Sequence, residues 1–296
     1  MILITGATGL VGGHLLWHLL QENEQIVAIR RKTSDIQPLK NIFRFYTDKP
    51  EKFLERVLWR TADVLDRESL ENAMLEISEV YHCAAVVSLS NNPDNIHEIN
   101  VQGTRNMVEV SMKWQIRKFC FVSSIAACGT NENDLPVNEN SKWEDNKTRS
   151  PYARSKFFSE QEVWKAISNG LNAVIVNPGV ILGYSGTNTG SSQIFSVVRK
   201  GLPFYIDGGS GYVCVEDVVR AMIILMKSKT NSERYILVEG NYSNYEILKK
   251  MAKAFGKNPP FIKISQRFIY TVGAFVEFTA KIFGFKPMFD RNLARS

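Results

Sequence analysis

Cysteine is scarce in this sequence, and its four cysteines show no paired spacing. Cys83 and Cys120 lie inside apolar, strand-like runs, which favours a reduced, cytoplasmic protein over a disulfide-stabilised secreted one. Long apolar runs are missing as well: no stretch of 18 uncharged apolar residues occurs, so no membrane-spanning helix is expected. A secretory leader is not expected, because Met1 is followed directly by a strand and a glycine turn.

Proline and glycine are moderate in number, 10 and 19 of 296 residues, and charged residues make up 22%. These values exclude disordered, collagen-like and low-complexity chains. Apolar residues reach 44%, enough for a sizeable core in one large domain or two unequal ones. The net charge of +6 is too small to indicate nucleic acid, and no phosphate-tracking pattern is visible, so no nucleic-acid partner is expected.

The positive charge is concentrated near the end of the sequence. From Lys249 to Ser296 there are ten Lys and Arg residues but only two acidic ones, Glu277 and Asp290. This segment therefore has a net charge of +8, and the rest of the chain has a net charge of about −2, which together give +6. Within it, residues 268–285 are rich in Phe, Ile and Val. The preferred interpretation is a helix that covers an apolar substrate pocket, and the alternative is an amphipathic helix in peripheral contact with a membrane.

Short apolar runs alternate with amphipathic stretches over the first two thirds of the chain. Strands that alternate with helices predict parallel βαβ units and a doubly wound parallel sheet of the α/β class. The stretch 33–56 is polar and irregular, with one helix expected around 51–56. Strands are expected at 2–4, 26–29, 57–63, 80–83, 119–123 and 173–176, and helices at 15–20, 69–77, 96–112 and 151–167.

Beyond about residue 178 this pattern loosens, because Gly and Asn cluster at 183–190 and 207–211. Helices are expected at 191–200, 217–226 and 243–255. We therefore expect two unequal parts. Residues 1–177 would form a nucleotide-binding domain, and residues 178–296 a smaller, mostly helical substrate lobe with some chain returning to the sheet.

A glycine turn follows the first strand and opens the first helix, with the spacing Gly-x-x-Gly-x-x-Gly. Glycine lets the backbone turn tightly and approach a pyrophosphate, whose charge meets the helix N-terminus. The alternative is an ordinary strand–turn–helix without a ligand, but the position at the very start of the chain favours a turn that binds a dinucleotide. The residues expected to line this site are Gly6, Thr8, Gly9, Leu10, Val11 and Gly12.

The second strand ends in a basic run that contains Arg30 and Arg31. A site for NAD usually offers an acidic group here to the ribose 2′-hydroxyl, whereas arginine suits a 2′-phosphate. The sequence thus predicts a preference for NADP(H), with NAD(H) as the alternative. The simplest alternative is that the basic run is a solvated loop that does not contact a cofactor. Asp63, after the third strand and next to Val64, is placed to reach the adenine.

Tyr152 and Lys156 lie four residues apart on one face of an expected helix. A nearby ammonium favours the phenolate, so Lys156 is expected to lower the pKa of Tyr152 and let it exchange a proton with a carbonyl or alcohol oxygen. This spacing is a poor motif alone, and Tyr245–Lys249 repeats it on an expected surface helix. What distinguishes Tyr152 is Ser124, a hydroxyl at the carboxyl end of a strand, where ligands of parallel sheets bind.

With these motifs the chain resembles an extended short-chain dehydrogenase/reductase, most like the dihydroflavonol reductase and 3β-hydroxysteroid dehydrogenase branch. The resemblance covers residues 1 to about 220 and implies a Rossmann-type fold. The motifs that support it are Thr5–Gly12, Asp63–Asp66, His82–Ala85, Asn100–Thr104, Ser123–Ser124, Tyr152–Lys156, Asn177–Gly179 and Val215–Val218.

The resemblance also implies roles for individual residues. Ser124, Tyr152 and Lys156 would be catalytic, with Asn100 supporting the site. The nicotinamide would lie beside Ala84, Ala85, Asn177, Pro178 and Val180, and Tyr152 and Lys156 would contact the cofactor too. The family further implies a homodimer in which the helices near 96–112 and 151–167 form a four-helix interface.

We expect an NADP-dependent oxidoreductase that interconverts a carbonyl and a secondary alcohol. One alternative is a nucleotide-sugar epimerase that retains its cofactor, and another is a non-catalytic NADP-binding sensor. The elimination chemistry of the 4,6-dehydratases is not expected, because Ile125 and Ala126 stand where those enzymes carry an Asp–Glu pair. Relatives usually extend further, so part of the substrate lobe is expected to be missing.

His14 and His18 lie four residues apart on the first helix, a spacing that can bind zinc. The residues between them supply no glutamate base, and no third ligand is evident. We therefore interpret both as packing histidines, and no metal site is expected.

Overall fold

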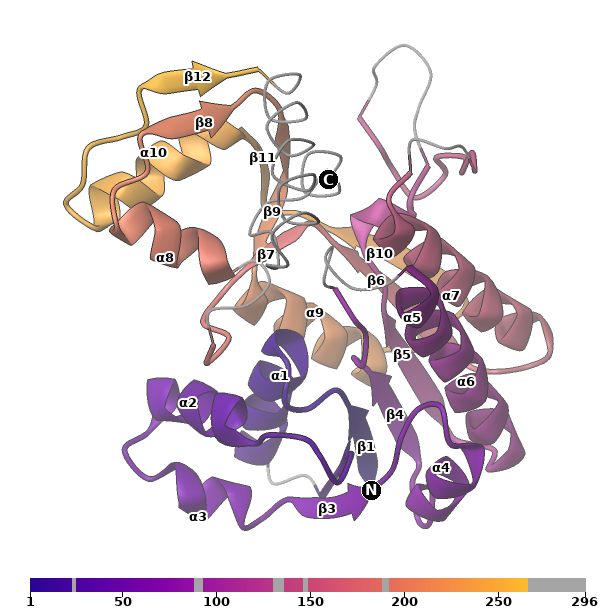
Figure 1. Cartoon of the computed structure of the whole chain (residues 1–296). Helices are drawn as coiled ribbons and strands as arrows, with labels where there is room; N and C mark the ends of the chain where they lie inside the picture. The colour runs from indigo at the N-terminus through magenta and orange to yellow at the C-terminus, as the bar shows by residue number, and fades with distance from the viewer. Residues whose placement is uncertain (23–24, 88–92, 130–135, 146–148, 188–191, 266–296) are drawn as a thin grey trace, which may run out of the picture.

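A computed structural model of the chain describes residues 1–22, 25–87, 93–129, 136–145, 149–187 and 192–265. Its centre is a seven-stranded sheet in the order β10-β6-β5-β4-β1-β2-β3, in which all neighbouring strands are parallel (Figure 1). The predicted doubly wound α/β sheet is thereby confirmed. The strands are β1 Ile2–Thr5, β2 Ile26–Arg30, β3 Leu58–Thr61, β4 Glu79–His82, β5 Lys118–Val122, β6 Ala173–Pro178 and β10 Glu233–Leu237.

Helices cover both faces of this sheet (Figure 1). Because both faces are covered, the inner strands are almost continuously apolar, and every residue of β1, β4, β5 and β6 is buried. One face carries α1 Leu10–Gln21, α2 Gln37–Tyr46, α3 Pro50–Leu54 and α9 Val215–Lys227. The other carries α4 Arg67–Ala73, α6 Gly103–Lys113 and α7 Pro151–Ser168.

The strand order reverses between β1 and β4, since β2 follows on one side of β1 and β4 lies on the other. At such a switch point the loops that leave the carboxyl ends of the strands diverge and open a crevice for a ligand. The segments that carry the predicted site residues all leave this edge: the turn after β1, the chain after β4 and the chain after β5.

Helix α2 corrects the expectation of an irregular stretch at 33–56. Pro38 occupies the first turn, where proline is tolerated, and Leu39, Ile42 and Phe43 are buried on one face. The polar residues between them hid this stripe in the sequence. The helix expected at 96–112 forms as α5 Pro93–His97, a π-helical segment Glu98–Gln102 and α6.

The chain after β6 builds a smaller group of elements, which lies apart from the large sheet at the upper left of Figure 1. It contains a three-stranded sheet of β7 Val180–Leu182, β9 Gly209–Cys214 and β11 Gly240–Ser243. A two-stranded sheet joins β8 Phe204–Ile206 to β12 Ile262–Ile264. Helices α8 Gln193–Arg199 and α10 Asn244–Ala254 pack with them around a core of their own.

This part of the chain has more strand than the mostly helical lobe that we expected, and β10 returns to the large sheet. The domain boundary at residue 177 stays a prediction. The apolar segment 268–285 lies outside the described residues.

Candidate active site

The glycine turn between β1 and α1 is tight at two positions. Gly6 has φ +68°, and a Cβ there would lie 2.7 Å from the backbone nitrogen of Ala84. A Cβ on Gly12 would lie 2.3 Å from the carbonyl oxygen of Gly6. Only glycine fits at both positions, and the close approach places the Ala84 segment against the turn.

The N-terminus of α1 is open to an anion. Its N-cap is Gly9, which has no side chain to accept from the free amides, and no acidic residue lies in the first turn. By contrast, the side chains of Asp66, Ser150 and Ser243 cap α4, α7 and α10. The residues present therefore fit the pyrophosphate of a dinucleotide, which would meet unpaired amides and the positive end of the helix dipole.

The basic end of β2 lies beside the end of β3. The guanidinium of Arg30 sits 5.0 Å from the ring centroid of Trp59, a cation–π contact that orients it. Arg31 is exposed, and its backbone N–H donates to Ser34 Oγ at 3.1 Å. In the loop after β3, Asp63 Oδ1 accepts from the backbone of Leu65 at 3.0 Å.

Ser124 and Tyr152, the two hydroxyls predicted to face one substrate oxygen, lie near each other. Ser124 follows β5, and its hydroxyl lies close enough to the phenol of Tyr152 on α7 to lower the pKa of that phenol. Helix α7 begins where Ser150 Oγ accepts from Ala153 N at 3.1 Å and Pro151 fills the first turn, which places Tyr152 at the rim of the sheet edge. Lys156 lies one turn further and is 3% exposed.

The electrostatics of this pair differ from our expectation. Burial raises the pKa of Tyr152, and the hydrogen bond from Ser124 offsets this only in part. Lys156 donates from Nζ to the carbonyl oxygen of Val122 at 2.7 Å and lies 4.7 Å from the centroid of the Phe121 ring. The predicted lowering of the Tyr152 pKa by Lys156 is thus wrong, because desolvation dominates and the ammonium is engaged by β5.

Burial lowers the pKa of Lys156 to about 8, and the neighbouring Glu160 and Cys83 oppose this shift. His82, at the end of β4, is neutral at physiological pH, because burial and Lys156 lower its pKa to about 3. Its ring bonds to Thr5 Oγ1 at 2.7 Å and Thr104 Oγ1 at 3.2 Å. The floor of the site is therefore a polar, well-connected layer.

Asn100 supports the site without touching Ser124 or Tyr152. It is 2% exposed and lies in the π-helical segment. Its amide donates to Val86 O at 3.0 Å and Ser155 Oγ at 2.9 Å, and its oxygen accepts from Val86 N at 2.8 Å. Asn100 thereby ties the chain after β4, which includes Ala84 and Ala85, to α7.

Asn177 lies at the end of β6, directly behind Ser124. Its amide donates to Ser124 O at 3.0 Å and to Glu160 Oε2 at 2.9 Å. Asn177 Oδ1 is buried and has no hydrogen-bond partner among the described residues, so an acceptor is free near the place predicted for the nicotinamide. Pro178 and Val180 continue from it into β7.

Sequence reasoning missed Glu160 and Arg234, and it named Ser123 only as part of a motif, without a role. Glu160 lies four residues after Lys156, so the helical spacing that pairs Tyr152 with Lys156 also signalled it. Arg234 reaches Glu160 from β10, 74 residues away, and no local pattern announces that contact.

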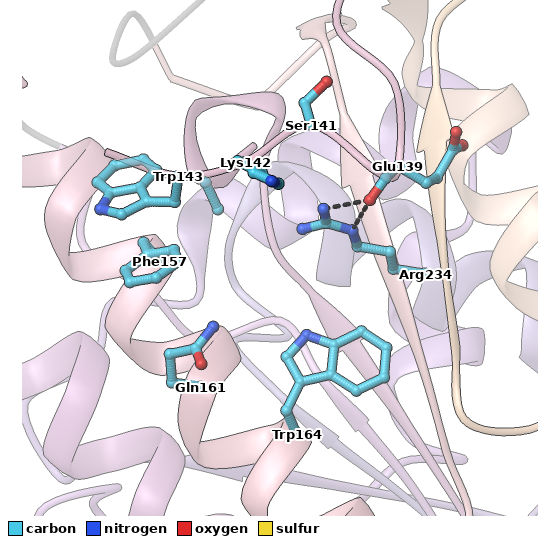
Figure 2. A pocket seen from close by; sticks show the side chains of 9 residues that line it. Glu139, Ser141, Lys142, Trp143, Phe157, Gln161, Trp164 and Arg234 are labelled. Carbon is cyan, nitrogen blue, oxygen red and sulfur yellow. Dashed lines mark hydrogen bonds between the residues drawn. The ribbon is translucent and has the colours of Figure 1, made fainter. Parts of the chain in front are cut away.

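A pocket of about 540 Å³ lies beside α7, lined there by Phe157, Gln161 and Trp164 (Figure 2). Trp143 stacks on Phe157 there with 4.4 Å between ring centroids, and Arg234 donates to the backbone oxygen of Glu139. The predicted Ser124, Tyr152 and Lys156 do not line it. We therefore separate this pocket from the predicted active site.

Both histidines of α1 are hydrogen-bonded within the protein. His14 bonds to the Tyr46 hydroxyl and to Tyr184 O, and His18 Nε2 lies 2.5 Å from Glu216 Oε2. Across the described part of the chain, no group of three or more His, Cys, Asp or Glu side chains is placed to hold a metal ion. No helix in that same part is long and apolar enough to cross a membrane.

The chain is similar to several known proteins. A putative dihydroflavonol 4-reductase of Synechocystis is 29% identical over 265 residues, which cover 87% of this chain and 73% of the relative. A cinnamoyl-CoA reductase 2 of Medicago truncatula is 28% identical over 269 residues, 87% of this chain and 77% of the relative. The crystal structure of gox2253 superposes with a TM-score of 0.79 at 25% identity, covering 99% of this chain and 86% of that one.

A family model described as "NAD dependent epimerase/dehydratase family" matches residues 2–238. With its glycine turn and the switch point in its strand order, the chain belongs to that family and is an enzyme of the extended short-chain dehydrogenase/reductase type.

Proposed function

We propose that the enzyme reduces a carbonyl to a secondary alcohol, or catalyses the reverse reaction, with NADP(H). The closeness of Ser124 and Tyr152 supports this proposal most strongly, because it places two hydroxyls where one substrate oxygen can meet both. The relatives named as reductases support the same class of reaction.

The roles of the residues follow from their surroundings. Bound NADPH supplies the hydride. The raised pKa of Tyr152 keeps its hydroxyl protonated at neutral pH, so Tyr152 donates a proton to the carbonyl oxygen. Ser124 donates a second hydrogen bond to that oxygen. The buried ammonium of Lys156, which is anchored to Val122 O, would hold the ribose of the cofactor.

The preference for the phosphorylated cofactor is supported by Arg30. Trp59 holds this guanidinium at the end of β2, where the site of an NAD enzyme usually offers an acidic group. A 2′-phosphate would pair with Arg30 and with the exposed Arg31. Gly6, Thr8, Gly9, Leu10, Val11 and Gly12 would hold the pyrophosphate, and Asp63 and Val64 would lie near the adenine.

A binding titration tests this preference. NADPH should bind at least tenfold more tightly than NADH, about 1.4 kcal/mol. Arg30→Ala should narrow the difference, and Lys32→Ala serves as the control on the same exposed loop. Equal affinities of the wild type for both cofactors would contradict the proposal.

We also propose a cytoplasmic homodimer formed through α6 and α7. Trp114, at the end of α6, is 39% exposed and offers an apolar contact. Phe157 is less suited to such a contact, because Trp143 stacks on its ring. Light scattering at micromolar concentration should give twice the chain mass of 33.6 kDa, whereas the mass of one chain would contradict the dimer.

A further inference from the structure

Glu160 is a buried carboxylate that accepts four hydrogen bonds. It is 1% exposed and lies one helical turn after Lys156 on α7. Its Oε2 accepts from Ser123 Oγ at 2.8 Å and Asn177 Nδ2 at 2.9 Å. Its Oε1 accepts from Arg234 at 2.9 Å and Trp164 Nε1 at 3.2 Å. Since every partner donates, the group fits its surroundings as a carboxylate.

These contacts converge on three consecutive residues at the end of β5. Lys156 holds the carbonyl of Val122, Glu160 holds the hydroxyl of Ser123, and Asn177 holds the carbonyl of Ser124. Glu160 also fixes the amide of Asn177, so two of these three contacts depend on one carboxylate. The contacts of Glu160 and Asn177 with the backbone and side chain at the end of β5 thereby fix the orientation of the Ser124 hydroxyl, which faces Tyr152.

Glu160 is also the carboxylate that faces Lys156 among the described residues. The other groups near the ammonium are Cys83 and His82 from the β4 segment. His82 is neutral at physiological pH, and burial raises the pKa of Cys83 to about 12, so neither supplies a counter-charge. The negative charge of Glu160 thus opposes the desolvation that favours loss of the Lys156 proton.

We propose that Glu160 is a positioning residue of the reaction, which orients Ser124 through Ser123 and Asn177 and places a carboxylate one helical turn from the Lys156 ammonium. The proposal rests on the proposed carbonyl reduction for its effect on rate, but its effect on Lys156 is independent of any substrate. Glu160 does not face the substrate oxygen itself, since Ser123 and Asn177 lie between.

Two variants separate the two parts of the proposal. Glu160→Gln removes the charge at nearly constant shape. It should lower kcat at least tenfold and shift the alkaline loss of activity to lower pH by about one unit, because Lys156 then loses its proton more easily. Glu160→Asp keeps the charge but retracts it by one methylene, so kcat should fall while the alkaline midpoint stays. Glu162→Gln is the matched control, since Glu162 lies on the same helix and pairs with the surface residue Arg105.

An NMR titration of lysine labelled at Nζ, with Lys156 assigned from a Lys156→Met variant, gives a readout without substrate. The Lys156 midpoint should fall in Glu160→Gln and stay at the wild-type value in Glu162→Gln. If Glu160→Gln changes neither the Lys156 midpoint nor kcat, the proposal is overturned, and this holds even if the variant has a lower melting temperature.

A second variant covers the case in which Glu160→Gln does not fold. Ser123→Ala should still lower kcat severalfold, and an unchanged kcat in Ser123→Ala would count against the proposal. A wild type without carbonyl reductase activity would refute the proposed function alone, and the titration would still decide the role of Glu160.

Discussion

Two clusters centred on a glutamate show how differently this fold uses a carboxylate. Glu160 lies between α7 and the sheet, is 1% exposed and pairs with Arg234, which keeps its charge at every physiological pH. Glu216 lies in the first turn of α9, has a side chain 31% exposed, and pairs with His18 and the Tyr46 hydroxyl. The first cluster fixes the catalytic edge, whereas the second joins α1, α2 and α9 through groups that titrate.

The difference teaches that burial and a permanent counter-charge make a cluster insensitive to pH but costly to break. The Glu216 cluster is open to solvent and has titratable partners, so breaking it costs little free energy of unfolding, and that cost depends on pH. Changes at the catalytic edge should therefore affect rate or cost much stability, and changes at the helix junction should have small effects that vary with pH.

Tyr152→Phe should have the largest effect on rate. The variant keeps the ring but removes the proton donor, so kcat should fall roughly 10²–10⁴-fold with cofactor affinity and melting temperature little changed. Steady-state kinetics with a carbonyl substrate and a cofactor titration measure the two quantities. Tyr245→Phe, at the second Tyr-x-x-x-Lys match, is the control and should keep full activity.

Arg234→Met should have the largest effect on stability. It leaves the buried Glu160 without its counter-charge, which should cost about 3–5 kcal/mol in the free energy of unfolding. Urea denaturation measures the loss. Replacing Glu160 by methionine as well should recover part of the stability, and a loss no larger than that of a surface ion pair would refute the special status of this cluster.

Glu216→Gln should have a smaller effect that depends on pH. Burial opposes ionisation of Glu216, but hydrogen bonds from Tyr46 and His18 outweigh it and hold its pKa below the usual value. A carboxyl whose pKa is depressed by folding stabilises the protein at neutral pH, and this stability is lost as the pH falls through the folded-state pKa. The variant should lose about 1–2 kcal/mol at pH 7 and less in acid.

Denaturation at several pH values checks this sign. Burial lowers the pKa of His14 and Glu216 opposes this shift, so loss of Glu216 also changes how His14 responds to acid. The test is therefore made below about pH 5, where the carboxyl itself takes up its proton, and a difference between variant and wild type that grows there as the pH falls would contradict the account.

Lys227→Ala should have the smallest effect. Lys227 pairs with Glu22 at 2.7 Å, but both side chains are exposed, so water and salt screen the pair. The loss should stay below about 0.5 kcal/mol. A larger loss of unfolding free energy in urea denaturation would show that this exposed ion pair stabilises the protein more than its exposure to solvent predicts.

The sequence predicted most of the sheet, because strands buried on both faces are short apolar runs that need no knowledge of distant contacts. It also predicted that Ser124 lies at the edge where the carboxyl ends of the parallel strands meet, because that placement follows from the strand pattern alone. It missed α2, whose buried stripe of Leu39, Ile42 and Phe43 is diluted by polar neighbours.

The remaining features depend on contacts across long stretches of chain. The contact of Arg234 with Glu160 spans 74 residues, and that of Glu216 with His18 spans 198. The direction of the Tyr152 pKa was mistaken for the same reason: helical spacing places Lys156 nearby but does not show that β5 engages its ammonium.

The most direct test of the central claim follows NADPH absorbance with the purified enzyme and a panel of aldehydes and ketones. The account predicts that the wild type consumes one NADPH for each alcohol formed and that Tyr152→Phe, with its NADPH affinity intact, does so at least 100-fold more slowly. Undiminished NADPH consumption by Tyr152→Phe would contradict the account. So would turnover of a nucleotide sugar by the wild type without net change in NADPH, or NADPH binding without turnover of any compound in the panel.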